Sequence, residues 1–307
     1  LLLSSASLRF AVAERTSLAG LVVKAAPLPA TRPRTAAPSP ISTPEAELPP
    51  LPEGPHRPSA DVIVISIDAL RFDHVGAYGY PRRTTPNLDA LAARSVRFER
   101  AYAQAPHTSF SVASMLTGKY YPTLARLAPG DPQDPVTTVL RKYGWKTAAF
   151  FPPAVFYVDA DKLRGFQETQ FQFEYVKFEY LDAFARLDQV AAYFDEVKPE
   201  RVFMWLHLFE PHEPYDAREG YDFGKKDVDR YDSEIAYTDA AIGKFLAYLE
   251  THRPGAIVIV TADHGEAFGE HDSRYHGSSL YDEQIRVPLI VHVPGVAPGV
   301  VKGQVEL

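Results

Sequence analysis

The chain has 307 residues, 46% of them hydrophobic and 23% charged, with a net charge of −7 at pH 7. This composition is typical of a globular protein long enough for a sizeable core, and the acidic balance argues against a nucleic-acid partner. The absence of cysteine excludes disulfides, thiolate metal sites and a cysteine nucleophile.

The first 60 residues differ in composition from the rest. Residues 1–25 contain short apolar runs that charged residues interrupt, so none is long enough to cross a membrane; they are either a membrane-proximal end or a frayed amphipathic piece. Residues 26–60 are rich in Pro and Ala, which predicts an extended linker. One domain is therefore expected over residues 61–307. Since the chain starts at Leu1 and stops soon after an apolar run, we expect a fragment.

The first strand is predicted over residues 61–67, a nearly continuous β-branched run. It ends at Asp68. A carboxylate at the carboxyl end of a central strand lies where α/β sheets bind ligands, although Asp68 could equally cap the next turn. Further on, Thr85 and Pro86 predict the start of a helix, with Thr85 as its N-cap.

Residues 105–118 place a group of hydroxyl side chains before a short apolar run and a glycine. One interpretation is a hydroxyl that caps a buried helix. The other is a reactive hydroxyl at a helix N-terminus, where the dipole and the free N–H groups favour an attacked anion. The hydroxyls concerned are Thr108, Ser109 and Ser111.

The rest of the chain alternates helical and strand patterns. Helices are predicted over 136–143, about 181–194 and about 228–250, and strands over 146–151, 202–206, 256–260 and 287–293. This alternation predicts an α/β fold, a three-layer α/β/α sandwich with a mostly parallel central sheet.

Two of these strands end in acidic residues, at Asp68 and at Asp263-His264. Two carboxylates and an imidazole suit a divalent cation, and a hydroxyl beside such an ion becomes a usable nucleophile. Five histidines fall in loops near strand ends, where they are candidates to contact an anion or protonate a leaving oxygen: His207, His212, His264, His271 and His276. Arg71 is a candidate to stabilise negative charge.

Together these motifs resemble the sulfatase family of the alkaline-phosphatase superfamily. The resemblance covers about residues 61–300 and rests on residues 62–68, 70–74, 76–79, 85–89, 113–118, 212–215, 231–239, 261–266 and 285–290. It departs from sulfatases that carry formylglycine. The Cys, Pro and Arg of their motif fall on Thr108, Phe110 and Val112, their second aspartate is Ala69, and their Gly-Lys-Trp-His lysine has no counterpart after Phe150.

What remains is similar to the threonine-nucleophile branch, which includes lipoteichoic-acid synthases and phosphoethanolamine transferases. The resemblance implies an alkaline-phosphatase-like domain whose C-terminal part is missing here. It also implies one divalent ion, with Mn²⁺ or Zn²⁺ favoured and Mg²⁺ or Ca²⁺ as the alternatives, because His264 replaces a third aspartate. Its ligands would be Asp68, Thr108, Asp263 and His264.

We therefore predict a hydrolase of sulfate or phosphate esters that acts through a covalent Thr108 intermediate. His212 and His276 would bind the ester oxygens or protonate the leaving group, His207 and Arg71 would contact the substrate, and Ser109 and Ser111 are alternative nucleophiles. The alternatives are a membrane-tethered phosphoglycerol or phosphoethanolamine transferase and an inactive, metal-stabilised binding module. The expected substrate is a small-molecule, lipid or glycan ester, and the expected location is the cell envelope, outside the cytoplasm, with a membrane tether upstream.

Overall fold

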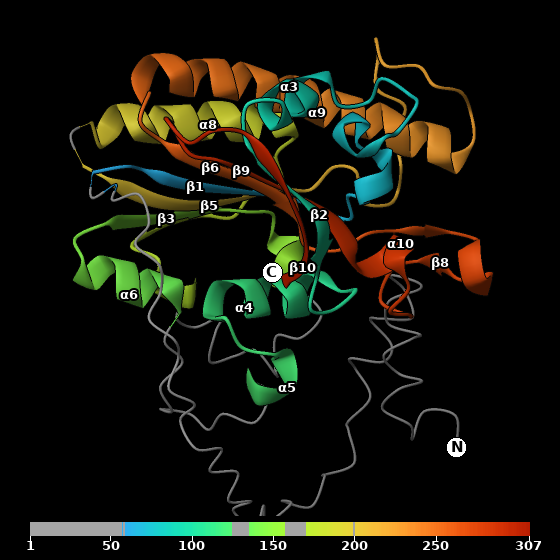
Figure 1. Cartoon of the computed structure of the whole chain (residues 1–307), viewed down its shortest axis with the longest axis horizontal. Coiled ribbons are helices and arrows are strands. Elements are labelled where there is room, and N and C mark those ends of the chain that lie inside the picture. The colour runs from blue at the N-terminus through green and yellow to red at the C-terminus, as the bar shows by residue number, and fades with distance from the viewer. Residues whose placement is uncertain (1–56, 58, 125–134, 157–169, 199) are drawn as a thin grey trace, which may run out of the picture. The chain divides into compact units, whose positions relative to one another are not determined.

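An eight-stranded sheet forms the centre of the computed structural model, which describes residues 57, 59–124, 135–156, 170–198 and 200–307 (Figure 1). Its order is β10-β2-β9-β6-β1-β5-β3-β4. The strands are β1 (Val62–Ile67), β2 (Val96–Tyr102), β3 (Lys146–Phe150), β4 (Tyr175–Lys177), β5 (Val202–Leu208), β6 (Ile257–Ala262), β9 (Arg286–His292) and β10 (Gly299–Glu306). β7 (Ala267–Phe268) and β8 (Arg274–Tyr275) form a separate hairpin.

The sheet is mostly parallel, as predicted. Strand β1 lies at its centre and pairs in parallel with β5 and β6, and β3 pairs in parallel with β4 and β5. Strand β9 runs antiparallel to both β2 and β6. The carboxyl ends of β1, β5 and β6 therefore lie at one edge of the sheet.

Helices cover both faces of the sheet, which confirms the three-layer prediction. Helices α3 (Pro86–Ala92), α8 (Ala183–Glu196) and α9 (Asp227–His252) lie on one face, and α4 (Thr108–Thr117), α5 (Tyr121–Leu124) and α6 (Val136–Lys142) lie on the other (Figure 1). The short α10 (Asp282–Ile285) leads into β9.

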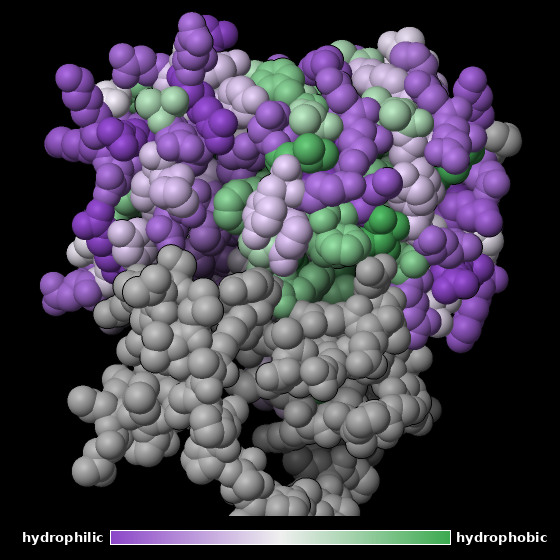
Figure 2. Space-filling model, turned by 180° about the vertical axis from the view of Figure 1, so that it is seen from behind, coloured by the Kyte–Doolittle hydropathy of each residue, from purple (hydrophilic) through white to green (hydrophobic). Residues whose placement is uncertain are grey.

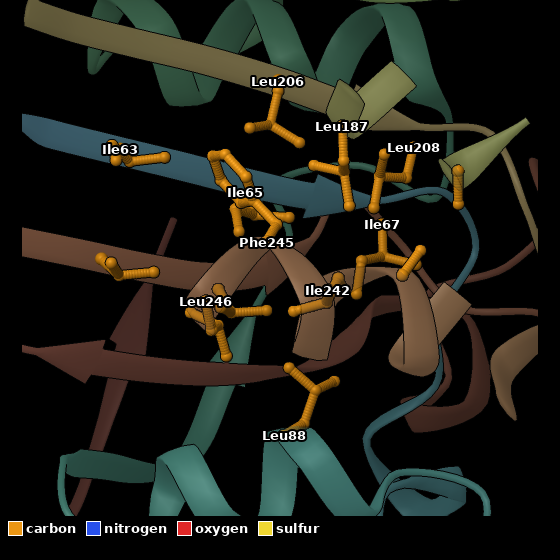
Figure 3. Packing of buried hydrophobic residues seen from close by; sticks show 14 of the residues in the cluster. Ile63, Ile65, Ile67, Leu88, Leu187, Leu206, Leu208, Ile242, Phe245 and Leu246 are labelled. Atoms are coloured by element: carbon orange, nitrogen blue, oxygen red, sulfur yellow. The ribbon is translucent and has the colours of Figure 1, made fainter. Parts of the chain in front are cut away.

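Each face has its own apolar core because successive side chains of a strand point to opposite sides. On the α9 side, Ile63, Ile65 and Ile67 of β1 pack with side chains of β5, α8, α9 and α3 (Figure 3). On the α4 side, Val112, Ala113 and Leu116 pack with Phe203 and Trp205 of β5. Hydrophilic side chains cover most of the visible part of the domain, with hydrophobic ones gathered near its middle (Figure 2).

Some elements differ from the predictions. Strands β2, β4 and β10 were not predicted. β2 and β10 carry many half-buried or exposed side chains, so they lack a continuous apolar run. Helix α4 begins at Thr108, and its N-cap is His107 without a side-chain cap bond, so the expected hydroxyl cap is wrong. Thr85 does occupy the N-cap of α3, yet its hydroxyl donates to Asp89 and not to the helix backbone.

Among the described residues, no helix has both the length and the apolar character to span a bilayer. The predicted segment 1–25 and nearly all of the predicted linker 26–60 lie outside the described residues.

Candidate active site

Strand register brings the two acidic motifs together. In the parallel pair of β1 and β6, Ile67 is opposite Ala262, and each strand ends at that position. The next residues are Asp68 and Asp263, which therefore lie side by side although 195 positions separate them along the chain. His264 follows directly, and the predicted meeting of the two motifs at one sheet edge is present.

These residues form a buried cluster with the geometry of a metal site. Ligand atoms of Asp68, Asp263 and His264 all lie within 4.8 Å of one another, the one such group of three among the described residues. The His264 Nε2 atom is 3.5 Å from Asp68 Oδ1 and 3.4 Å from Asp263 Oδ2. Thr108 adds its hydroxyl, 3.0 Å from the same Nε2 atom.

Each carboxylate has one oxygen held by the protein and one that is not. Asp263 Oδ1 accepts from the backbone N–H groups of Ala69 (3.2 Å) and His264 (3.0 Å), and Asp68 Oδ2 lies 3.2 Å from His207 Nε2. Asp68 Oδ1 and Asp263 Oδ2 are buried without a hydrogen-bond partner. Because an unpaired buried carboxylate oxygen is unfavourable, these two atoms and His264 Nε2 fit a divalent cation.

The electrostatics of the cluster point the same way. Burial alone would raise the pKa of Asp68, but the neighbouring His212 and His207 outweigh it, and the pKa is lowered. Burial, and then the charge on Asp68, raise the pKa of Asp263. Burial lowers the pKa of His264, which keeps its imidazole neutral. Two adjacent buried carboxylates and a neutral imidazole make a set that a cation would stabilise.

Thr108 is the first residue of α4, where backbone N–H groups have no partner within the helix and the dipole favours negative charge. Its side chain is 8% exposed. Ser109, a proposed alternative nucleophile, instead donates to the carbonyl of Val155 (2.6 Å), and Ser111 is buried without a hydrogen-bond partner for its hydroxyl. Of the three hydroxyls, Thr108 is the one in contact with the cluster.

His212 and His276 lie next to the cluster and are both half-buried. The ring centroid of His276 is 4.3 Å from that of His264 and 4.9 Å from that of His212. The Nδ1 atom of His212 donates to the carbonyl of Glu213 (2.6 Å). The structure thus places His276 beside His264, and His212 beside His276.

Two predicted substrate-binding residues have other contacts. His207 is fully buried between Ser66 Oγ (2.8 Å from Nδ1) and Asp68, so it lies behind the cluster and orients Asp68. Arg71 is 7% exposed, and its guanidinium donates to Asp73 and Glu270 and to the carbonyl of Glu266. The carboxylates of Asp73 and Glu270 offset the charge of Arg71, and protein groups hold both Arg71 and His207; that these two residues contact the substrate stays a prediction.

Sequence reasoning gave no role to Glu266. Its side chain is fully buried, one oxygen lies 3.1 Å from His276 Nδ1, and the other accepts from Tyr215 Oη (2.9 Å). Burial raises the pKa of Glu266 to about 7. The available signal was its position two residues after His264, within a motif already singled out. Between them, Gly265 leaves no room for a side chain, since a Cβ there would lie 2.2 Å from the carbonyl oxygen of Glu283.

Comparison with known proteins gives consistent results. The model of the sulfatase family matches residues 60–306. The ulvan-active sulfatase of Formosa agariphila is 25% identical over 289 residues, covering 77% of this chain and 56% of that protein. The phosphoethanolamine transferase EptA of Helicobacter pylori is 26% identical over 268 residues, covering 78% of this chain and 48% of that protein. The chain thus spans about half the length of these curated relatives.

Solved structures share the fold. The C-terminal periplasmic domain of EcEptC from Escherichia coli, solved as a complex with Zn, matches with a TM-score of 0.61 and 16% identity. The match covers 76% of this chain and 73% of that one. At this identity the likeness concerns the fold alone.

Proposed function

Because the chain belongs to the sulfatase family of the alkaline-phosphatase superfamily, we propose that it is an enzyme that cleaves or transfers a sulfate or phosphate ester, with Thr108 as its nucleophile. The observation that carries this proposal is the hydroxyl of Thr108, 3.0 Å from His264 Nε2, beside two buried carboxylate oxygens without partners. A hydroxyl needs such an environment to react at neutral pH.

One divalent cation, Zn²⁺ or Mn²⁺, would be held by Asp68, Asp263, His264 and the Thr108 oxygen. The mixed oxygen and nitrogen donors favour these ions over Ca²⁺, and a related domain was solved with Zn. When bound, the cation would act as a Lewis acid that lowers the pKa of the hydroxyl and offsets negative charge on the ester. His207 would hold Asp68 through its Oδ2 atom, and the backbone N–H of Ala69 would hold Asp263 through its Oδ1 atom.

The reaction follows from where these side chains lie. Thr108 Oγ1 attacks the phosphorus or sulfur and passes its proton to a histidine of the site, a bond forms between that oxygen and the attacked atom, and the bond to the leaving oxygen breaks. The N-terminus of α4 stabilises the added negative charge. His212 and His276 would bind the oxygens of the ester, and the histidine that has taken up the Thr108 proton gives it to the leaving oxygen. The group carried by Thr108 then passes to water or to an acceptor hydroxyl.

Transfer to an acceptor is the second candidate, and two observations favour it. Thr108 stands where formylglycine sulfatases carry their modified residue, and the chain is 26% identical to a phosphoethanolamine transferase. We place the enzyme outside the cytoplasm, in the cell envelope, because the related EcEptC domain is periplasmic. A small-molecule, lipid or glycan ester would then be the substrate.

The test is a panel of aryl phosphodiesters, phosphomonoesters and sulfates with added Zn²⁺ or Mn²⁺. Thr108→Ala should lower the rate by about 10³-fold or more, as removal of a nucleophile does. Ser109→Ala, one residue along the same helix, is the matched control and should keep most of the activity. Equal rates for wild type and Thr108→Ala would refute the nucleophile, and a wild type inactive on every ester would favour the binding module. Label transferred to an added alcohol would identify a transferase.

A further inference from the structure

A buried carboxylate connects the two loops that carry His212 and His276. Building on the proposed function, we propose that Glu266 is a positioning residue that keeps a proton on Nδ1 of His276, so that Nε2 is the ring nitrogen that takes up a proton and then gives it to the leaving oxygen. Tyr215 in turn holds Glu266. Neither Glu266 nor Tyr215 is needed as a metal ligand or nucleophile in the reaction described above.

Both carboxylate oxygens of Glu266 have a defined partner. Oε1 lies 3.1 Å from His276 Nδ1, and Oε2 accepts the Tyr215 hydroxyl at 2.9 Å. Tyr215 follows His212 by three residues, and His276 directly follows β8. A single buried side chain therefore sets the position of one loop against the other.

In all three histidines of the site the Nδ1 atom contacts an oxygen of the protein, but the group that carries this oxygen differs. The Nδ1 atoms of His264 and His212 donate to the backbone carbonyls of Gly265 (2.9 Å) and Glu213 (2.6 Å). His276 is the one whose Nδ1 partner is a side chain. The ionised form of Glu266 accepts only, so it requires a proton on Nδ1 and makes Nε2 the nitrogen that can gain or lose a proton. Imidazole in water prefers the opposite tautomer, with its proton on Nε2.

The surroundings keep Glu266 in place. Its side chain is fully buried, and the turn before it is packed so closely that a Cβ on Gly265 would lie 2.2 Å from the carbonyl oxygen of Glu283. The side chain of His276 is 15% exposed and that of Glu266 is fully buried, so the ring is the accessible member of this pair. Because the ring is rigid, a contact that fixes Nδ1 also fixes the direction of Nε2.

A second histidine–carboxylate pair provides a matched control. His271 Nδ1 lies 2.9 Å from Glu283 Oε1, and the side chain of Glu283 is 7% exposed. This pair lies in the same stretch of chain but makes no hydrogen bond to Thr108 or the carboxylates in the described structure. Glu283→Leu therefore removes the same kind of contact without altering the site.

The primary experiment reads the tautomer directly. Two-dimensional ¹⁵N–¹H spectra of the imidazoles are recorded on the full 307-residue chain with EDTA at a fixed pH above 7, where Glu266 is ionised and the imidazoles are neutral. His276 is assigned from the signals lost in His276→Gln. We expect Nδ1–H for wild type, Glu266→Gln and Glu283→Leu. Glu266→Leu, or Glu266→Ala if the leucine variant does not fold, should shift His276 to Nε2–H. Retention of Nδ1–H in a folded Leu or Ala variant overturns the proposal.

The kinetic experiment asks whether that tautomer matters. With Zn²⁺ and the most active ester of the panel, Glu266→Leu should lower kcat by about 10- to 100-fold, the usual effect of losing a group that orients a site residue, with KM within about threefold. Glu266→Gln should recover most of the loss, and Glu283→Leu should match wild type. Equal losses in the Glu266 and Glu283 variants would overturn the proposal. If wild type cleaves no ester, the proposed function fails. The tautomer of His276 still tests the role of Glu266, because that measurement does not need activity.

Discussion

At the scale of single residues, the chemistry of the site depends on the two oxygens of each carboxylate: protein groups hold one of them, and the other is available to a cation. Asp68 and Asp263 each have one oxygen held by His207 or by backbone N–H groups, and one buried oxygen without a partner. This division orients the unpartnered oxygens toward His264 and Thr108. It also leaves two buried like charges next to each other, which lowers stability unless a cation binds.

Asp263→Asn separates these two effects. The amide keeps the oxygen that accepts from Ala69 and His264 but removes one of the two charges. In EDTA we expect the free energy of unfolding to rise by about 1–2 kcal/mol, because a buried uncompensated charge is lost. At a Zn²⁺ concentration a hundredfold above Kd, the free energy of unfolding of wild type should rise by about 3 kcal/mol, and that of the variant should change little.

Thermal or denaturant unfolding with EDTA and with Zn²⁺ measures both changes. Asp61→Asn is the control, since Asp61 is also a buried carboxylate but precedes the opposite end of β1. It should leave the response to Zn²⁺ intact. A full Zn²⁺ response in Asp263→Asn would contradict the assignment of Asp263 as a ligand.

At the scale of elements, α9 and the loop after β5 are joined by a buried ion-pair group. Arg218 donates to Glu210 (3.3 Å) and to Glu234 of α9 (2.9 Å). Glu210 lies two residues before His212, so this group fixes the loop on which His212 lies. Burial raises the pKa of Glu234 to about 7, although Arg218 acts in the opposite direction.

Glu234 should therefore make stability fall with pH. Between its ordinary pKa of 4.5 and about 7, the folded chain binds the Glu234 proton more tightly than the unfolded chain does, so the contribution of this group to stability is lost as pH rises through that window. Relative to Glu234→Gln, wild type should lose about 1–3 kcal/mol of unfolding free energy between about pH 4.5 and pH 8. Urea unfolding across this range measures it. Parallel pH curves for the two proteins would show that Glu234 does not titrate in this window.

At the scale of the whole molecule, both apolar cores lie within one compact unit, Arg57–Leu307. This unit contains the sheet, the helices on both of its faces and every residue of the proposed site. We therefore propose that residues 61–307 form the catalytic domain and that residues 26–60 link it to what precedes.

A chain of residues 57–307 should consequently keep the properties of the domain. Because both cores are retained, we expect its Tm to lie within about 4 °C of that of the full chain, which corresponds to less than about 1–2 kcal/mol. Its gain in Tm with Zn²⁺ should equal that of the 307-residue chain. Differential scanning calorimetry of the two chains, side by side, measures both, and a fall in Tm beyond about 10 °C would place part of the domain before residue 57.

Much of the fold and the centre of the site could be predicted from the sequence, because their signals are local. β-Branched runs specify β1 and β6, and parallel strands end at one sheet edge, so Asp68, Asp263 and His264 were expected to meet. The partly exposed strands β2 and β10 lack such a run and were missed. Tertiary structure alone decided that β1 lies between β5 and β6, that His207 lies behind Asp68, that carboxylates neutralise Arg71, and that Glu266 holds His276. These depend on contacts between residues up to about 200 positions apart, which no local pattern encodes.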